Sequence, residues 1–237
     1  MTDDIPANQN MPEQEDGPAR EPMINLPSAT RALVLINIAV FLLEMFLPAH
    51  LSNALIGHLA FIPARYSGRL PFGFDAVVSP VTYMFLHGGW MHIGVNVTAL
   101  MAFGAGMERI MGARRMLAFY FLTGIIAAFT HALVYPHATV PVIGASGAIS
   151  GLFGGILIVM ADAGLMGGDA ADGARKPRYK VLLPIIVLWI LAAALFGYTG
   201  MPGVASPIAW TAHIGGFVAG LLLFKPCLRI GRKNITI

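Results

Sequence analysis

Six long apolar runs constrain the fold of this 237-residue chain more than any other feature. A helix needs roughly 20 mainly apolar residues to cross the hydrocarbon core of a bilayer. The runs lie at about 31–48, 81–106, 115–135, 146–163, 180–198 and 206–225. Charged residues make up only 11% of the sequence, against about 25% in a soluble domain. The pattern predicts an all-α, multi-pass membrane protein with six spans.

The basic residues lie mainly in alternate connections between these runs. They are Arg20 and Arg31, then Arg109, Arg114 and Arg115, then Arg175, Lys176, Arg178 and Lys180, and finally Lys225, Arg229, Arg232 and Lys233, with only Arg65 and Arg69 elsewhere. Because basic loops stay in the cytoplasm, we expect both termini to be cytoplasmic and residues 49–80, 136–145 and 199–205 to face the other side. The pI of about 9.2 therefore reflects orientation in a membrane, and no nucleic-acid partner is expected.

The two ends of the chain differ from the apolar region between them. Residues 1–27 are rich in Pro, Asn, Gln and acidic residues, with no basic start followed by an apolar core. Such a composition is typical of a disordered polar tail and not of a signal peptide. We expect one membrane domain over 28–228 and a short basic cytoplasmic tail over 229–237. Cys227 is the only cysteine, so no intrachain disulfide is expected.

Four polar side chains share one depth, because the second, fourth and sixth runs enter the membrane from the same side. Ser146 opens the fourth run, and His213 lies about two turns into the sixth. His92 and Asn96, at i and i+4, share one helix face in the second. A polar group at such a depth is a functional-site hypothesis, and a Ser hydroxyl becomes nucleophilic when an imidazole takes its proton. The pattern predicts nucleophile–base chemistry, with His92 and Asn96 as hydrogen-bond donors.

Small residues recur at every fourth position in the fourth and sixth runs. The two sets are Gly147, Gly151 and Gly155, and Ala212, Gly216 and Gly220. Such ridges let membrane helices approach closely, so we expect these two helices to pack with their backbones nearly touching and to bring Ser146 and His213 together. Gly144 and Gly147 would permit close approach to the free N–H groups at the helix start. Glycine ridges also occur in transporters, where they indicate tight packing alone.

Four segments, in order, carry a family resemblance. They are Phe85-Leu86-His87-Gly88-Gly89-Trp90-Met91-His92 with Asn96, Phe103-Gly104 through Glu108-Arg109 and Gly112, Gly144-Ala145-Ser146-Gly147-Ala148-Ile149-Ser150-Gly151, and Ala212-His213-Ile214-Gly215-Gly216. Over roughly 81–225 the chain resembles the rhomboid family of intramembrane serine proteases. Two features depart from some members: residues 49–80 hold no Trp-Arg pair, and Ser150 stands where an aromatic residue can follow the nucleophile.

The resemblance implies a six-helix bundle with a Ser146–His213 dyad that has no acidic third member. It also implies an oxyanion hole formed by Asn96, His92 and the Ser146 backbone N–H, supported by His87, Gly144 and Gly147. The expected reaction is cleavage of other membrane proteins' transmembrane segments near the extracytoplasmic boundary, with no cofactor or metal. We expect the protein to be embedded in a lipid bilayer, that of a bacterial inner membrane. The sequence leaves the oligomeric state open.

Other interpretations stay open at this point. An inactive rhomboid-like protein would bind or escort membrane proteins, although such a protein would lack the dyad. A metal site built from His87, His92, His131 and His213 would lack an acidic ligand and the H-E-x-x-H pattern. A transporter would show inverted repeats, which the sequence does not. We also expect His50, His58 and His137 to be solvated loop residues, and Glu108 to form an ion pair with Arg109.

Overall fold

The computed structural model describes residues 25–164, 178–199 and 209–229. Several predictions from the sequence fall outside these ranges. They are the polar tail over residues 1–24, the basic residues Arg175 and Lys176, the connection over 200–205, and the C-terminal tail from residue 230.

The described chain is helical, and helices occupy each of the six predicted runs. They are α1 (Ser28–Phe46), α5 (Trp90–Ala99) continued by η2 (Leu100–Gly104) and α6 (Ala105–Met111), α7 (Ala113–Val134), α8 (Ser146–Asp162), α9 (Arg178–Thr199) and α10 (Trp210–Arg229). Among the described residues, α1, α7 and α10 are long and apolar enough to cross a membrane, while α8 and Leu182–Leu195 within α9 are shorter apolar helices. The prediction of an all-α membrane protein is thereby confirmed.

The second run begins later than the sequence pattern indicated. Residues 81–89 do not belong to its helix: Phe74–Thr82 form α4, Tyr83–Phe85 form the 3-10 turn η1, and α5 starts only at Trp90. Gly89 adopts φ 148°, a conformation that favours glycine and breaks the helix. The late start leaves residues 86–89 as a turn beside the first turn of α5. Further along, η2 is a single π-helical turn, a feature often found at functional sites.

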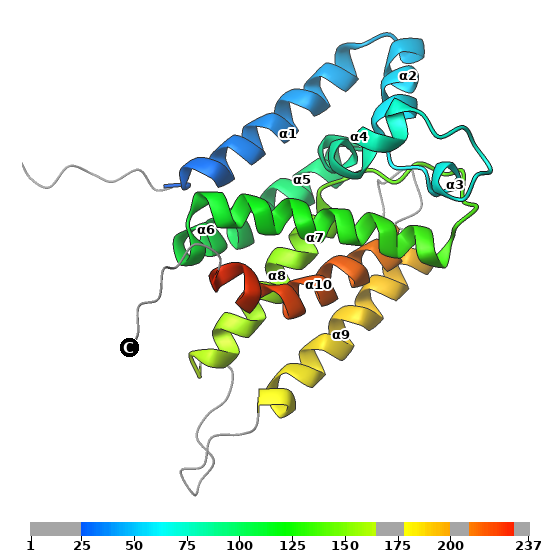
Figure 1. Cartoon of the computed structure of the whole chain (residues 1–237). Helices are drawn as coiled ribbons and strands as arrows, with labels where there is room; N and C mark the ends of the chain where they lie inside the picture. The colour runs from blue at the N-terminus through cyan, green and yellow to red at the C-terminus, as the bar shows by residue number, and fades with distance from the viewer. Residues whose placement is uncertain (1–24, 165–177, 200–208, 230–237) are drawn as a thin grey trace, which may run out of the picture.

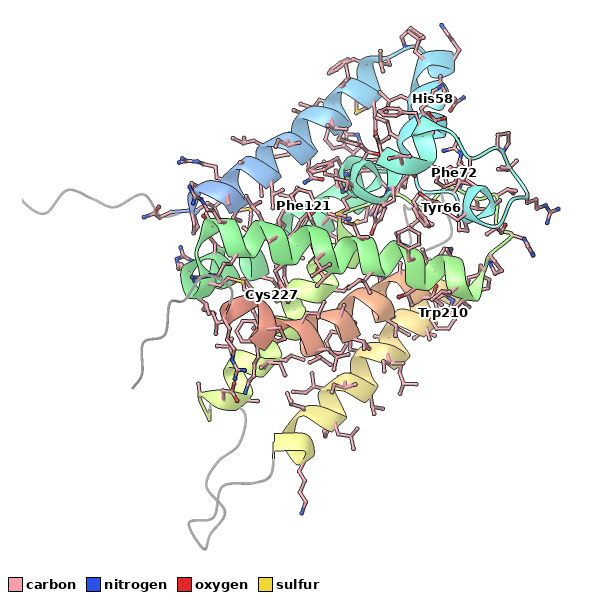
Figure 2. The ribbon with its side chains drawn as sticks, viewed as in Figure 1. His58, Tyr66, Phe72, Phe121, Trp210 and Cys227 are labelled. Atoms are coloured by element: carbon pink, nitrogen blue, oxygen red, sulfur yellow. The ribbon has the colours of Figure 1, made fainter. Side chains whose placement is uncertain are left out.

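Residues 49–80 were expected to be a connection, yet they hold α2 (Ala49–Leu59), α3 (Pro63–Tyr66) and α4. Polar contacts bind these short helices together. Arg65 donates to the Gly57 carbonyl at 2.7 Å, and Asp75 lies 2.9 Å from His58 and 3.6 Å from Arg65. His58 therefore lies in a helix and not in the predicted loop, and it contacts an acid, while its side chain is exposed as predicted. Figure 2 shows His58 and Tyr66 in this segment.

Helices α7, α8 and α10 pack together at the centre of the bundle (Figure 1). A Cβ on Gly216 would overlap the Gly147 carbonyl and lie 2.9 Å from its carbon, and Gly220 meets the Gly151 backbone in the same way. The predicted close approach of these two helices is present. Gly155 does not take part, because a Cβ there would meet Met107 at 2.9 Å.

Gly154 takes the place in this contact that the sequence pattern gave to Gly155. A Cβ on Gly154 would lie 2.5 Å from the Phe217 carbonyl oxygen of α10. The reason is helix geometry: at 3.6 residues per turn, position i+7 returns to within roughly 20° of position i, whereas i+8 is rotated by roughly 80°. A strict repeat of four therefore leaves the contact face after two steps.

Candidate active site

The start of α8 and the first turn of α10 bring a hydroxyl and an imidazole into contact. Ser146 is the first residue of α8, and its Oγ lies 2.6 Å from Nε2 of His213. His213 stands in the first turn of α10, since that helix begins at Trp210 and not near 206. Trp210 marks this end of α10 in Figure 2, with Cys227 near the other end. At this distance the hydroxyl donates its proton to an unprotonated Nε2.

The turn before α8 opens toward α5. Gly144 has φ 112°, and its N–H donates to the Tyr83 carbonyl at 2.9 Å. A Cβ on Gly144 would lie 2.6 Å from Nε2 of His92 and 3.8 Å from Nδ2 of Asn96. Only glycine fits both this conformation and this space. Its absent side chain therefore lets two side chains of α5 reach the backbone next to Ser146.

Three hydrogen-bond donors can face this point. The N–H of Ser146, as the first helical residue, has no acceptor within α8. Asn96 uses one amide N–H on the His92 carbonyl at 2.9 Å, and its amide carries a second donor. His92 accepts the Gly88 N–H on Nδ1 at 3.3 Å. The proton of a neutral His92 ring is therefore assigned to Nε2, the nitrogen that faces Gly144.

The second histidine of this region, His87, has a different role in the geometry. Its side chain is buried, and its Nδ1 lies 3.2 Å from the Phe85 carbonyl oxygen, to which it donates. The His87 and His92 rings pack edge to face with centroids 5.1 Å apart. The His87 ring thus packs against the His92 ring and supports it.

Supporting contacts fix the helix starts. A Cβ on Gly147 would lie 2.7 Å from Cβ of Ala127 and 3.1 Å from the Tyr83 hydroxyl. Ser150 is buried, and its hydroxyl donates a hydrogen bond to the Ser146 carbonyl at 2.8 Å, within α8. His131 lies 2.7 Å from Oγ1 of Thr211 and ties α7 to the start of α10.

The histidines of the site bind separate partners: His87 the Phe85 carbonyl, His92 the Gly88 amide, His131 Thr211 and His213 Ser146. In the described part of the chain, no three His, Cys, Asp or Glu side chains lie in an arrangement that could hold a metal ion.

Comparison with known proteins now decides the family. Residues 75–230 match the family model described as the Rhomboid domain. The chain belongs to the rhomboid family. The resemblance seen in the four sequence segments is thereby confirmed, and with the apolar helices it supports intramembrane proteolysis as the general activity.

Named relatives of this rhomboid chain include proteases. It is 28% identical to Rhomboid protease AarA of Providencia stuartii over 82% of the chain and 70% of that protein. It is 26% identical to human Rhomboid-related protein 3, over 82% of the chain and 44% of that protein. Identity to Rhomboid protease GluP of Bacillus subtilis is 31%, over 59% of the chain and 24% of that protein. The match thus spans less than half the length of two of these three relatives.

From the sequence of this rhomboid chain we assigned no role to Glu44 or Tyr83. For Glu108 we predicted an ion pair with Arg109, which is wrong. Glu108 does not pair with Arg109. It accepts the backbone N–H groups of Ala29 and Thr30 at 2.9 and 2.7 Å, and so caps the start of α1. The free amide groups at a helix start attract a carboxylate more effectively than an exposed neighbouring arginine does. A lone acid within or beside an apolar run is the signal that would have identified both glutamates.

Proposed function

We propose that this protein is an active intramembrane serine endopeptidase with Ser146 as nucleophile and His213 as general base. The observation that carries the proposal is the 2.6 Å contact between Ser146 Oγ and His213 Nε2 at the meeting point of two helix starts. Buried packing alone would favour apolar side chains here, because a polar pair inside a membrane is costly. Family membership supports the same reaction class.

The chemistry follows from the placed groups. Ser146 Oγ attacks the carbonyl carbon of the scissile peptide bond while its proton moves to Nε2 of His213. The oxyanion that forms accepts hydrogen bonds from the Ser146 N–H, Asn96 and His92. The intermediate collapses, the C–N bond breaks, and the leaving amine takes the proton from His213. Water then loses a proton to His213 and attacks the acyl carbon. The ester bond to Ser146 breaks, the new carboxyl terminus leaves, and His213 returns the proton to Ser146 Oγ.

We also propose six membrane spans, with both termini in the cytoplasm of a bacterial cell and the bundle in its inner membrane. The protease domain would cover residues 28–228, between the polar tail 1–27 and the basic tail 229–237. In Figure 1, α1 begins and α10 ends at one end of the bundle, while α2 and α3 lie at the other. Alkaline phosphatase fused within residues 49–80 should be active, and the same enzyme fused after residue 237 should be inactive.

The proposed substrates are transmembrane segments that unwind near the extracytoplasmic boundary. A membrane helix hides its carbonyls in its own hydrogen bonds, and each exposed polar backbone group in lipid costs several kcal/mol. Gly or Pro lowers the cost of unwinding. Single-span reporters that differ only in the outer third of the helix should be cut when they carry Gly or Pro and spared when they carry only Leu. Cuts that map to the cytoplasmic side would contradict this assignment.

A serine-directed fluorophosphonate decides between a protease and an inactive escort protein. In detergent, the native chain should be labelled at Ser146, whereas Ser146→Ala and His213→Ala should be neither labelled nor active. Ser150→Ala is the matched control, since Ser150 is a hydroxyl one turn away that bonds along α8, and it should be labelled normally. A native chain that folds and resists the probe would favour the escort protein, and a Ser146→Ala variant that still cuts at the native rate would make Ser150 the candidate nucleophile.

A further inference from the structure

Helix α1 carries a buried carboxyl group that the proposed reaction does not use. Glu44 is only 8% exposed and lies near the end of α1, beside α5 and η1. One oxygen, Oε2, accepts the backbone N–H of His87 at 3.3 Å. The other, Oε1, is buried and has no hydrogen-bond partner within the described residues.

Packing does not explain this carboxyl. A buried polar atom left without a partner destabilises the folded protein, and an apolar side chain of the same length would avoid that cost. A glutamate at such a position indicates that its one hydrogen bond has a use.

That hydrogen bond reaches the turn from which α5 presents its donors. Two successive backbone N–H groups of the turn donate hydrogen bonds to different side chains. The N–H of His87 points to Glu44, and the N–H of Gly88 points to Nδ1 of His92. Gly89, with φ 148°, then leads into α5. A turn that contains Gly88 and Gly89 has little stiffness of its own, so an outside anchor is needed to hold the Gly88 amide in register with the imidazole.

We propose that Glu44 is a positioning residue for the active site: it anchors the 86–89 turn, and through the Gly88 amide it fixes the orientation and tautomer of His92. The proton on His92 Nε2 then faces the space beside Gly144 where the oxyanion forms. Without the anchor, the Gly88 amide moves, Nδ1 of His92 loses its donor, and the ring samples the tautomer whose Nε2 cannot donate. This inference rests on the proposed function, because only that reaction uses the Nε2 proton.

Three substitutions of Glu44 separate the reach of the side chain from its carboxyl group. Glu44→Gln keeps the length and an acceptor oxygen but loses the ionisable carboxyl group. Glu44→Asp keeps the carboxyl group but is one methylene shorter. Glu44→Met keeps the length and loses the acceptor. Asn37→Ala is the matched control, since Asn37 is another buried polar residue of α1 and donates to the Leu33 carbonyl, away from the turn.

We expect Glu44→Asp and Glu44→Met to lower kcat on a single-span reporter by up to about 10²-fold, the loss that a displacement of about 1 Å can cause. KM should not change, because the scissile segment still binds. Glu44→Gln should retain nearly the native kcat. Asn37→Ala should lower thermal stability without lowering the kcat of the folded fraction.

The second readout is independent of cleavage. Nitrogen-15 NMR of histidine-labelled protein, with the His92 signals assigned through His92→Gln, reports which ring nitrogen carries the proton. The native chain should show protonated Nε2, and Glu44→Asp should show a mixture of tautomers. Measured in a Ser146→Ala background, the same shift should appear, so the link between Glu44 and His92 is tested even if the proposed proteolysis fails.

Two results would overturn the positioning role. If Glu44→Asp stays active while Glu44→Gln is inactive, the ionisable carboxyl group matters and not the reach of the side chain. If all three variants keep the native kcat and the native His92 tautomer, Glu44 is only a packing residue. Should Glu44→Met fail to fold, the comparison of Glu44→Asp with Glu44→Gln still decides the question.

Discussion

The contact between α8 and α10 makes a quantitative prediction about Gly216. This residue lies one turn after His213 and presses on the backbone of Gly147, the neighbour of Ser146. A Cβ at Gly216 would lie 2.9 Å from the Gly147 carbonyl carbon, whereas carbon atoms in contact prefer about 3.5–4.0 Å. The two helices would have to separate locally by at least roughly 0.6–1.1 Å, the difference between these values.

Such a displacement would disrupt the 2.6 Å contact between Ser146 and His213. A shift of about 1 Å at reacting groups can cost 10²-fold in rate, and overpacking of this kind typically costs about 1–3 kcal/mol of stability. Gly216→Ala should therefore lower kcat by about 10²-fold and lower the melting temperature in detergent. Fluorophosphonate labelling of Ser146 should slow by a similar factor, because the probe needs the same activated hydroxyl.

Gly106→Ala is the control for this experiment. Its Cβ would meet only Ile156 at 3.4 Å, an ordinary contact, and alanine is the better helix former by about 1 kcal/mol. We expect native activity and equal or greater stability. If Gly216→Ala labels and cleaves at the native rate with an unchanged melting temperature, the close packing of α8 and α10 is not what holds the dyad together.

Three further predictions concern single groups. Asn96→Ala should lower kcat by about 10²–10³-fold, the usual cost of one oxyanion donor, or less if His92 compensates; an unchanged kcat would remove Asn96 from the oxyanion hole. Glu108→Gln should lower the free energy of unfolding by about 1.5–3 kcal/mol, the range for hydrogen bonds to charged groups, because its carboxylate caps α1; thermal unfolding of the folded variant, compared with Arg109→Gln, tests this. Chelation with EDTA should leave proteolysis intact, whereas loss of activity restored by zinc would support a metal site.

Much of the fold could be predicted because membrane-spanning helices appear in the sequence as long apolar runs. The runs that became α1, α7 and α8 were predicted within three residues at each end, since apolar length is a direct requirement of the bilayer. Residues 49–80 were not predicted to be helical. Their helices are short and are held by polar contacts such as Arg65 to Gly57, so the sequence shows no regular spacing of apolar residues there. The start of α5 was also misplaced, since a run of apolar residues does not reveal a turn at two glycines.

The sequence by itself predicted which side chains could react. Ser146, His213, Asn96 and His92 stand out because polar groups are rare in apolar runs, and the alternation of basic loops predicts that they share one depth. Tertiary structure alone decided how they are held. Gly154 and not Gly155 meets α10, Glu108 caps α1, and Glu44 anchors the turn before α5. These contacts join residues far apart in the chain. The angle at which two helices cross selects which residues meet, and a sequence pattern does not contain that angle.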